Sequence, residues 1–196
     1  MRSPRRTLLA LTLGGSLVAA ASPRGTQAEV APDAGPQPLP DARLRRSDGE
    51  PVRLSRYRGR PVILFYEDRH SLKLNEALKE QLFDRGRSAG LLRAVSLLAV
   101  ANLEAYDFFP ARGIALSYVR DAERKVGVPI LVDLDGVLSQ EPWWLPGRSS
   151  SVVLLDRTGA EVFRASGALT PGETERFFAA LGRLLGRDLT ALGQQP

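Results

Sequence analysis

The chain has 196 residues, a formal net charge of +5 and no cysteine. Without a thiol it can carry out neither disulfide exchange nor thiol-based peroxide reduction, because both reactions need a thiolate nucleophile. The positive charge does not predict nucleic-acid binding. Residues 1–28 hold four arginines and no acidic residue. The rest of the chain therefore carries 23 of the 27 basic groups and 22 acidic groups, so that its net charge is close to zero. No nucleic-acid recognition motif accompanies them.

The first 28 residues have the three parts of an export signal peptide. A basic start with three arginines is followed by an apolar run over residues 8–21. Small residues suited to cleavage end at two places, Ala21 and Ala28. The apolar run is shorter than the about 20 residues of a membrane span, so we expect cleavage and no stable membrane anchor. The signal predicts a periplasmic location, reached by the Sec route in preference to the twin-arginine route that Arg5-Arg6 resembles.

Composition divides the rest of the chain into three parts. Residues 29–41 contain four prolines and no periodic apolar pattern, which predicts an extended linker. Residues 42–187 have the apolar patterning and the length of one domain with a single core. Residues 188–196 are predicted to form a C-terminal tail.

Strand and helix patterns alternate along residues 42–187. Turn residues at Asp48-Gly49 and at Arg157-Thr158-Gly159 predict two hairpins. A capping box, Thr170-Pro171-Gly172-Glu173, predicts the start of a last helix. Between the hairpins, the predicted buried strands cover residues 60–66, 94–100 and 129–133, and the predicted helices cover residues 74–86 and 113–125. This order predicts an α/β domain whose central mixed sheet is flanked by helices on both faces.

This order of elements and four sequence motifs resemble the thioredoxin-like proteins of the peroxiredoxin and TlpA type. The similarity is greatest to the YtfJ family of small exported bacterial proteins, which has no established activity. The matching segments are residues 69–75, 133–137, 149–159 and 167–171. The resemblance covers nearly the whole predicted domain and implies a thioredoxin-like fold.

The resemblance also locates a degenerate active site. Thiol-active relatives carry the reactive cysteine at the amino end of a helix, where the helix dipole stabilises a thiolate. Here Ser71 stands near that place, Leu74 stands where a resolving cysteine would be, and Ser150 replaces the cis-proline that redox families place before a late strand. The predicted degenerate site consists of Asp68, Arg69, His70, Ser71, Lys73, Leu74 and Ser150.

Each candidate residue also has a structural interpretation. Ser71 could act as a nucleophile with His70 as its base, but we favour a role as helix N-cap, for which serine is a preferred residue. A single histidine without a second soft or nitrogen ligand makes a poor metal site. The charged residues Glu67, Asp68 and Arg69 indicate either a ligand site at the end of a strand or a solvated loop.

Two adjacent tryptophans, Trp143 and Trp144, lie between prolines in an irregular stretch. Tryptophan is enriched at binding hot spots, so the pair is a candidate contact for a partner protein. The two side chains could equally cover the sheet as part of the core. Both interpretations remain open at this point.

The sequence therefore predicts an exported binding or scaffolding domain without thiol redox activity, with a periplasmic protein partner, no cofactor, no metal and no catalytic residue. Two alternatives remain. One is a non-thiol enzyme that uses His70 and Ser71, and the other is a periplasmic metal chaperone that uses His70.

Overall fold

The structure is a computed structural model that describes residues 37–88, 90–189 and 191. The predicted signal peptide and residues 29–36 of the predicted linker lie outside the described residues, as does most of the predicted tail. The account below concerns the described residues alone.

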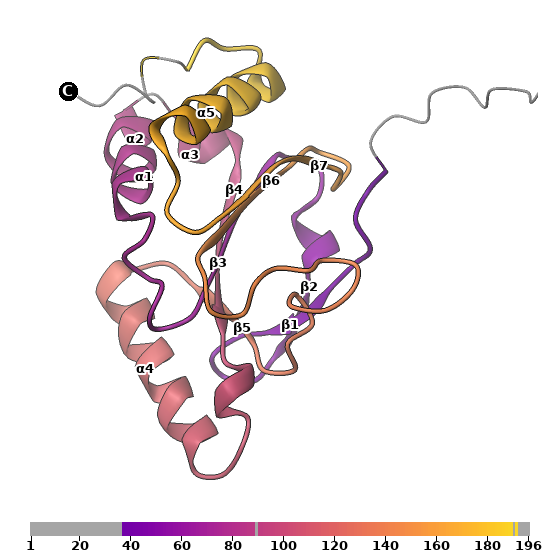
Figure 1. Ribbon diagram of the computed structural model, residues 1–196, viewed down its shortest axis with the longest axis vertical. Helices are drawn as coiled ribbons and strands as arrows, with labels where there is room; N and C mark the ends of the chain where they lie inside the picture. The colour runs from indigo at the N-terminus through magenta and orange to yellow at the C-terminus, as the bar shows by residue number, and fades with distance from the viewer. Residues whose placement is uncertain (1–36, 89, 190, 192–196) are drawn as a thin grey trace, which may run out of the picture. The chain divides into compact units, whose positions relative to one another are not determined.

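Seven strands form one mixed sheet in the order β2-β1-β5-β4-β3-β6-β7, which is seen nearly edge-on in Figure 1. Strands β3, β4 and β5 are parallel, and the two hairpins add antiparallel strands at both sides. Both hairpins and the three buried strands predicted from the sequence are confirmed. The strands are β1 (Arg43–Arg45), β2 (Pro51–Arg53), β3 (Val62–Glu67), β4 (Ser96–Asn102), β5 (Ile130–Asp133), β6 (Ser151–Leu155) and β7 (Glu161–Ser166).

Helical segments connect and flank these strands. A continuous stretch after β3 comprises a short α-helix, one π-helical segment and a further helical turn. The segments are η1 (Leu54–Tyr57), α1 (Glu76–Glu80), η2 (Gln81–Arg85), α2 (Gly86–Ser88), α3 (Leu91–Ala94), η3 (Glu104–Tyr106), α4 (Ala111–Val126) and α5 (Pro171–Leu185). The predicted capping box of α5 is confirmed, since the Thr170 side chain accepts from the Glu173 amide and the Glu173 side chain accepts from the Thr170 amide.

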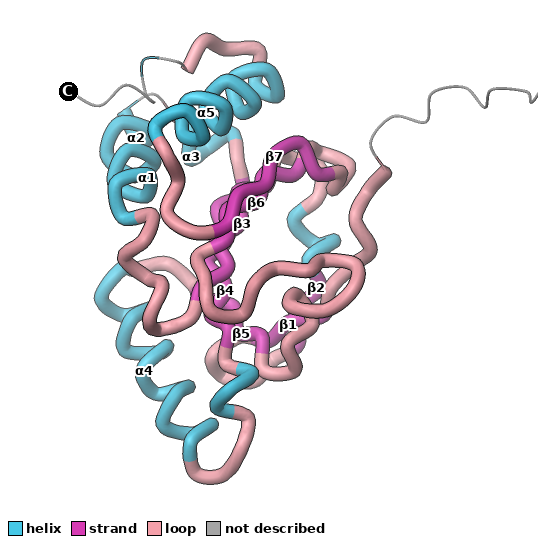
Figure 2. Tube along the Cα trace, viewed as in Figure 1, coloured by secondary structure: helices cyan, strands magenta, loops and turns pink. Residues whose placement is uncertain are grey.

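The α-helices that bring large apolar side chains to the core pack on one face of the sheet (Figure 2). Ile63 and Phe65 of β3 belong to a core that includes Leu78 of α1 and Phe177 of α5. Helix α4 packs on the same face farther along the sheet, because Val132 of β5 belongs to its cluster. The chain steps in one direction from β3 to β4 to β5, and successive right-handed crossovers in one direction place their helices on one face.

The other face of the sheet receives a different cover. Leu64 and Tyr66 of β3 point into a second core with Leu54 of η1 and with side chains from the loop of residues 134–150. The predicted α/β domain with a central mixed sheet flanked by helices is confirmed. Among the described residues the cover of this second face consists of the short 3-10 helix η1 and a loop, whereas the longer α-helices lie on the first face.

Candidate functional site

The predicted site begins with a tight turn at the carboxyl end of β3. The Asp68 carboxylate accepts hydrogen bonds from the amides of His70 (3.1 Å) and Ser71 (2.9 Å). The Ser71 hydroxyl in return accepts from the Asp68 amide at 3.0 Å. Helix α1 starts only at Glu76, with Asn75 as its N-cap residue. The prediction that Ser71 caps the helix is therefore wrong: Ser71 closes a separate turn whose first residue is Asp68.

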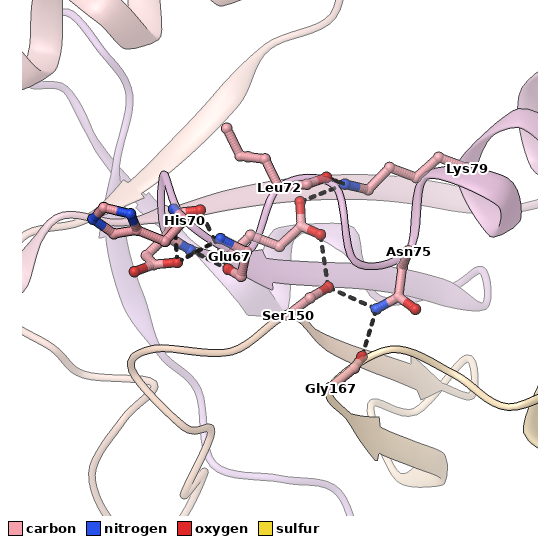
Figure 3. Close-up of polar contacts among 9 residues, drawn as sticks. Glu67, His70, Leu72, Asn75, Lys79, Ser150 and Gly167 are labelled. Atoms are coloured by element: carbon pink, nitrogen blue, oxygen red, sulfur yellow. Dashed lines mark hydrogen bonds and ion pairs between the residues drawn. The ribbon is translucent and has the colours of Figure 1, made fainter.

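This turn separates the two side chains that an enzyme mechanism would need together. Ser71 is buried, and its hydroxyl oxygen contacts the backbone of Asp68. His70 is exposed, and its ring makes no hydrogen bond with any residue that the structure describes. Figure 3 shows the ring turned away from the polar network beside it. The geometry therefore gives no support to a nucleophile and base pair formed by His70 and Ser71.

A buried polar network lies directly beside the turn (Figure 3). One oxygen of Glu67 accepts from the Lys79 ammonium group at 2.6 Å, and the other accepts from the Ser150 hydroxyl at 2.7 Å. Lys79 also donates to the carbonyl oxygen of Leu72 at 2.8 Å. Glu67 and Ser150 are buried. A carboxylate at this depth is tolerated because it is both ion-paired and hydrogen-bonded.

Asn75 extends the network across the molecule. Its amide nitrogen donates to the Ser150 hydroxyl (2.8 Å) and to the Gly167 carbonyl (2.9 Å), while its oxygen accepts from the Leu169 amide (2.9 Å). Asn75 therefore ties the start of α1 to the segment before β6 and to the loop after β7. Every polar atom of its side chain that is described here has a structural partner, so this network holds segments together and offers no free nucleophile.

The structure therefore places the seven predicted site residues in two groups. Asp68, Ser71 and Ser150 are buried and structural. Arg69, His70, Lys73 and Leu74 are exposed, and the neighbouring Leu72 is exposed as well. We call the surface formed by Arg69, His70, Leu72, Lys73 and Leu74 the β3 turn surface. It combines cationic and apolar groups at the carboxyl end of a central strand, where open α/β sheets bind ligands.

Sequence reasoning misses three residues of the network, namely Glu67, Asn75 and Lys79. Glu67 was interpreted as part of either a ligand site or a solvated loop, whereas it is the buried centre of the network. Asn75 was not singled out, and its partners at Gly167 and Leu169 are 92 and 94 residues away in the sequence. The sequence signal that could have indicated burial of Glu67 is its position at the end of an apolar strand.

The two adjacent tryptophans have opposite environments. Trp143 is 2% exposed and packs in the core with Leu54 and Leu138, so it is removed from the candidate partner contact. Trp144 is 65% exposed and has a left-handed backbone with φ of 49°. Such a conformation is strained for a residue with a large side chain. Trp144 therefore remains the candidate contact.

The loop that carries Trp144 is anchored by a buried carboxylate. Asp133, the last residue of β5, accepts from the amides of Val137 and Leu138, each at 2.8 Å, and from the Tyr66 hydroxyl at 3.2 Å. Burial raises the pKa of the Asp133 carboxyl group, and the nearby Glu104 carboxylate raises this pKa further. The three hydrogen bonds lower the pKa, but burial outweighs them. The first residues of the loop are thus fixed at the carboxyl end of β5, the end of the sheet at which the β3 turn also lies, whereas Trp143 lies beside Val62 and Leu155 at the amino end of β3.

This raised pKa predicts a pH dependence of stability. The folded state holds the Asp133 proton more tightly than the unfolded chain, so the contribution is most favourable below about pH 3.9 and is lost as the pH rises through the folded pKa. The Asp133→Asn variant lacks this titration. We expect the stability of the wild type relative to that variant to decrease between about pH 3 and about pH 7, measured by urea unfolding. A relative stability that increases with pH would show that the amide hydrogen bonds dominate over burial.

Two further observations concern the described residues only. No three acidic or histidine side chains among them gather in a way that could hold a metal ion. In that same part of the chain, no helix is both long enough and apolar enough to cross a membrane.

Comparison with known proteins identifies the fold. No protein-family model and no curated protein matches the chain. The exposed lipoprotein thioredoxin Etrx1 from Streptococcus pneumoniae strain TIGR4 is similar in structure, with a TM-score of 0.51 and 22% identity over 74% of this chain and 100% of that chain. An uncharacterized conserved protein from Geobacillus kaustophilus is also similar, with a TM-score of 0.54 and 16% identity over 79% of this chain and 84% of that chain.

A thiol:disulfide interchange protein of the thioredoxin family from Chlorobium tepidum TLS gives a TM-score of 0.51 and 15% identity, over 79% of this chain and 99% of that chain. At these identities the similarity shows the fold alone. The chain has a thioredoxin-like α/β fold, as predicted. It combines that fold with a sequence of 196 residues that contains no cysteine.

Proposed function

We propose that this chain is an exported, redox-inactive thioredoxin-like domain of the YtfJ type that binds a protein partner in the bacterial periplasm. In this proposal residues 1–28 are the cleaved signal peptide, residues 29–41 are a linker, and residues 42–187 are the binding domain. The domain uses the β3 turn surface together with Trp144.

The buried network of Glu67, Ser150, Asn75 and Lys79 is the observation that carries the proposal. In this fold the neighbourhood of Ser71 and Ser150 is where thiol-active relatives place their reactive groups. Here the same neighbourhood is filled by side chains that bond one another. The network supports a rigid surface rather than a reactive one, because none of its members is both exposed and without a partner.

The chemistry of the surface indicates the kind of partner. Arg69 and Lys73 supply positive charge, and Leu72 and Leu74 supply exposed apolar area. A large aromatic side chain such as that of Trp144 is a frequent centre of binding energy in protein interfaces. A partner with acidic and apolar side chains fits this combination.

Crosslinked capture from a periplasmic extract tests the proposal, with the exported protein as bait. We expect Leu74→Asp and Trp144→Ala each to reduce recovery of the partner about tenfold or more, a loss typical of hot-spot residues. Val126→Asp is the matched control, since Val126 is an exposed apolar residue before β5, at the opposite edge of the sheet. A partner recovered equally well with all three variants contradicts the proposed surface.

A further inference from the structure

The segment that precedes the domain runs beside the hairpin of β6 and β7. Pro38 forms an antiparallel bridge with Ala160, the residue immediately before β7. The Leu39 amide donates a hydrogen bond to the Gly159 carbonyl at 3.0 Å. The Leu39 side chain packs against the core that contains Leu54. These contacts are the start of a further strand beside the hairpin.

Strand β7 has an outer edge that no other strand of the described residues covers. It is the last strand of the sheet and pairs only with β6. The amide of Gly167, the next residue after β7, donates to the Ser150 carbonyl on the β6 side. Alternate residues of a strand direct their backbone groups to opposite sides, so those of Arg164 and Ser166 point away from β6. An open edge of this kind accepts an additional strand.

The spacing of prolines before the domain fits a strand at this edge. The Leu39 amide faces the hairpin, so in a continued strand the odd-numbered residues direct their amides toward β7 and the even-numbered residues direct theirs away. Proline has no amide hydrogen and is tolerated in an edge strand where that hydrogen would face solvent. All four prolines of residues 29–41 are even-numbered, namely Pro32, Pro36, Pro38 and Pro40. The amides needed for pairing with β7 are therefore retained.

We propose that the outer edge of β7 is a strand-addition site and that the chain's own residues 34–36 occupy it. They continue the pairing that begins at Pro38, antiparallel to β7. The register between β6 and β7 shifts by one residue near the start of β7. A bulge shifts the pairing on both sides of a strand, so Gly35 lies opposite Arg164. The Gly35 amide donates to the Arg164 carbonyl, and the Arg164 amide donates to the Gly35 carbonyl.

The chain's own segment fits this edge better than a strand from another molecule. It is already held beside the hairpin at Leu39, so its effective concentration at the edge is high and no association step is needed. The prolines at positions 36 and 38 also leave the new outer edge without donors at these positions, which prevents a further strand from pairing there. This inference is independent of the β3 turn surface and of the partner proposed above.

Hydrogen exchange of the Arg164 amide, followed by NMR in the exported protein, tests this proposal. We expect this amide to exchange slowly in the wild type, because it is hydrogen-bonded to residue 35. Gly35→Pro removes a donor that faces β7, and we expect it to speed the exchange about fivefold to tenfold. Ala34→Pro is the matched control, because the amide that it removes faces away from β7. We expect Ala34→Pro to leave the exchange rate unchanged.

Three results would overturn the proposal. A wild-type Arg164 amide that exchanges as fast as an amide in an unstructured peptide would show that the edge is empty. Equal exchange rates in Gly35→Pro and Ala34→Pro would contradict the alternation of the added strand. Protection that rises with protein concentration would show that a second copy, and not residues 34–36, supplies the strand. The amides of β6 serve as an internal reference, since we expect both variants to leave their exchange unchanged.

Discussion

Replacing Asn75 by alanine is expected to lower the free energy of unfolding by about 2–4 kcal/mol. The substitution removes hydrogen bonds to Ser150, Gly167 and Leu169 and leaves polar groups at these positions without a partner. Asn75 is 3% exposed, so water cannot replace the lost bonds without opening the structure. Urea unfolding followed by circular dichroism measures the change.

The control for this prediction is the next residue in the chain. Glu76 is exposed, and Glu76→Ala is expected to change stability by no more than about 0.5 kcal/mol. Loss of a helix cap cannot explain a large effect of Asn75→Ala, because the Asn75 side chain makes no capping hydrogen bond to α1. If the two variants proved equally stable, the network would not be holding the three segments together.

The second large expected effect is on stability, when the two tryptophans are replaced one at a time. Trp143→Ala is expected to cost about 3–5 kcal/mol, because it leaves a large cavity in the core beneath the loop of residues 134–150. Trp144→Gly is expected to leave stability unchanged or to raise it by up to about 1 kcal/mol, because glycine adopts the left-handed conformation without strain. Circular dichroism is the suitable measurement, since both variants change tryptophan fluorescence.

These two variants control for each other. Each removes one of only two tryptophans in the chain, from adjacent positions in one loop. A similar loss of stability in both would mean that Trp144 also packs against the protein, which would remove it as a candidate contact. A small effect in Trp143→Ala would mean that the loop can close over the vacated space.

The sequence predicted most of the elements because their signals are local. The apolar run of β3, the turn residues between β6 and β7 and the capping box before α5 each lie within a few adjacent residues. The N-cap of α1 is assigned wrongly when Ser71 is considered alone, since the N-cap residue is Asn75. A capping box that begins at Ser71 requires Glu or Gln three residues later, and that position is occupied by Leu74. Ser71 itself stands three residues after Asp68, which is the spacing of the turn that these two residues close.

The features that could not be predicted depend on tertiary structure. The face covered by α4 depends on the order of strands in the sheet, which one sequence does not reveal. Trp143 and Trp144 have the same side chain and neighbouring positions, and only the fold assigns one to the core and the other to the surface. The polar partners of Asn75 come from parts of the chain that local patterns do not connect.

The contacts of Asn75 join parts of the chain that are far apart in the sequence, and this separation affects the order of folding. Local hairpins and helical turns close short loops, whereas the contacts of Asn75 with Ser150 and Leu169 close loops of 75 and 94 residues. Loop closure over long separations is slow and becomes favourable only when other contacts already hold the ends together. We therefore expect the corner around Glu67 to assemble late, after the C-terminal hairpin has joined the parallel strands.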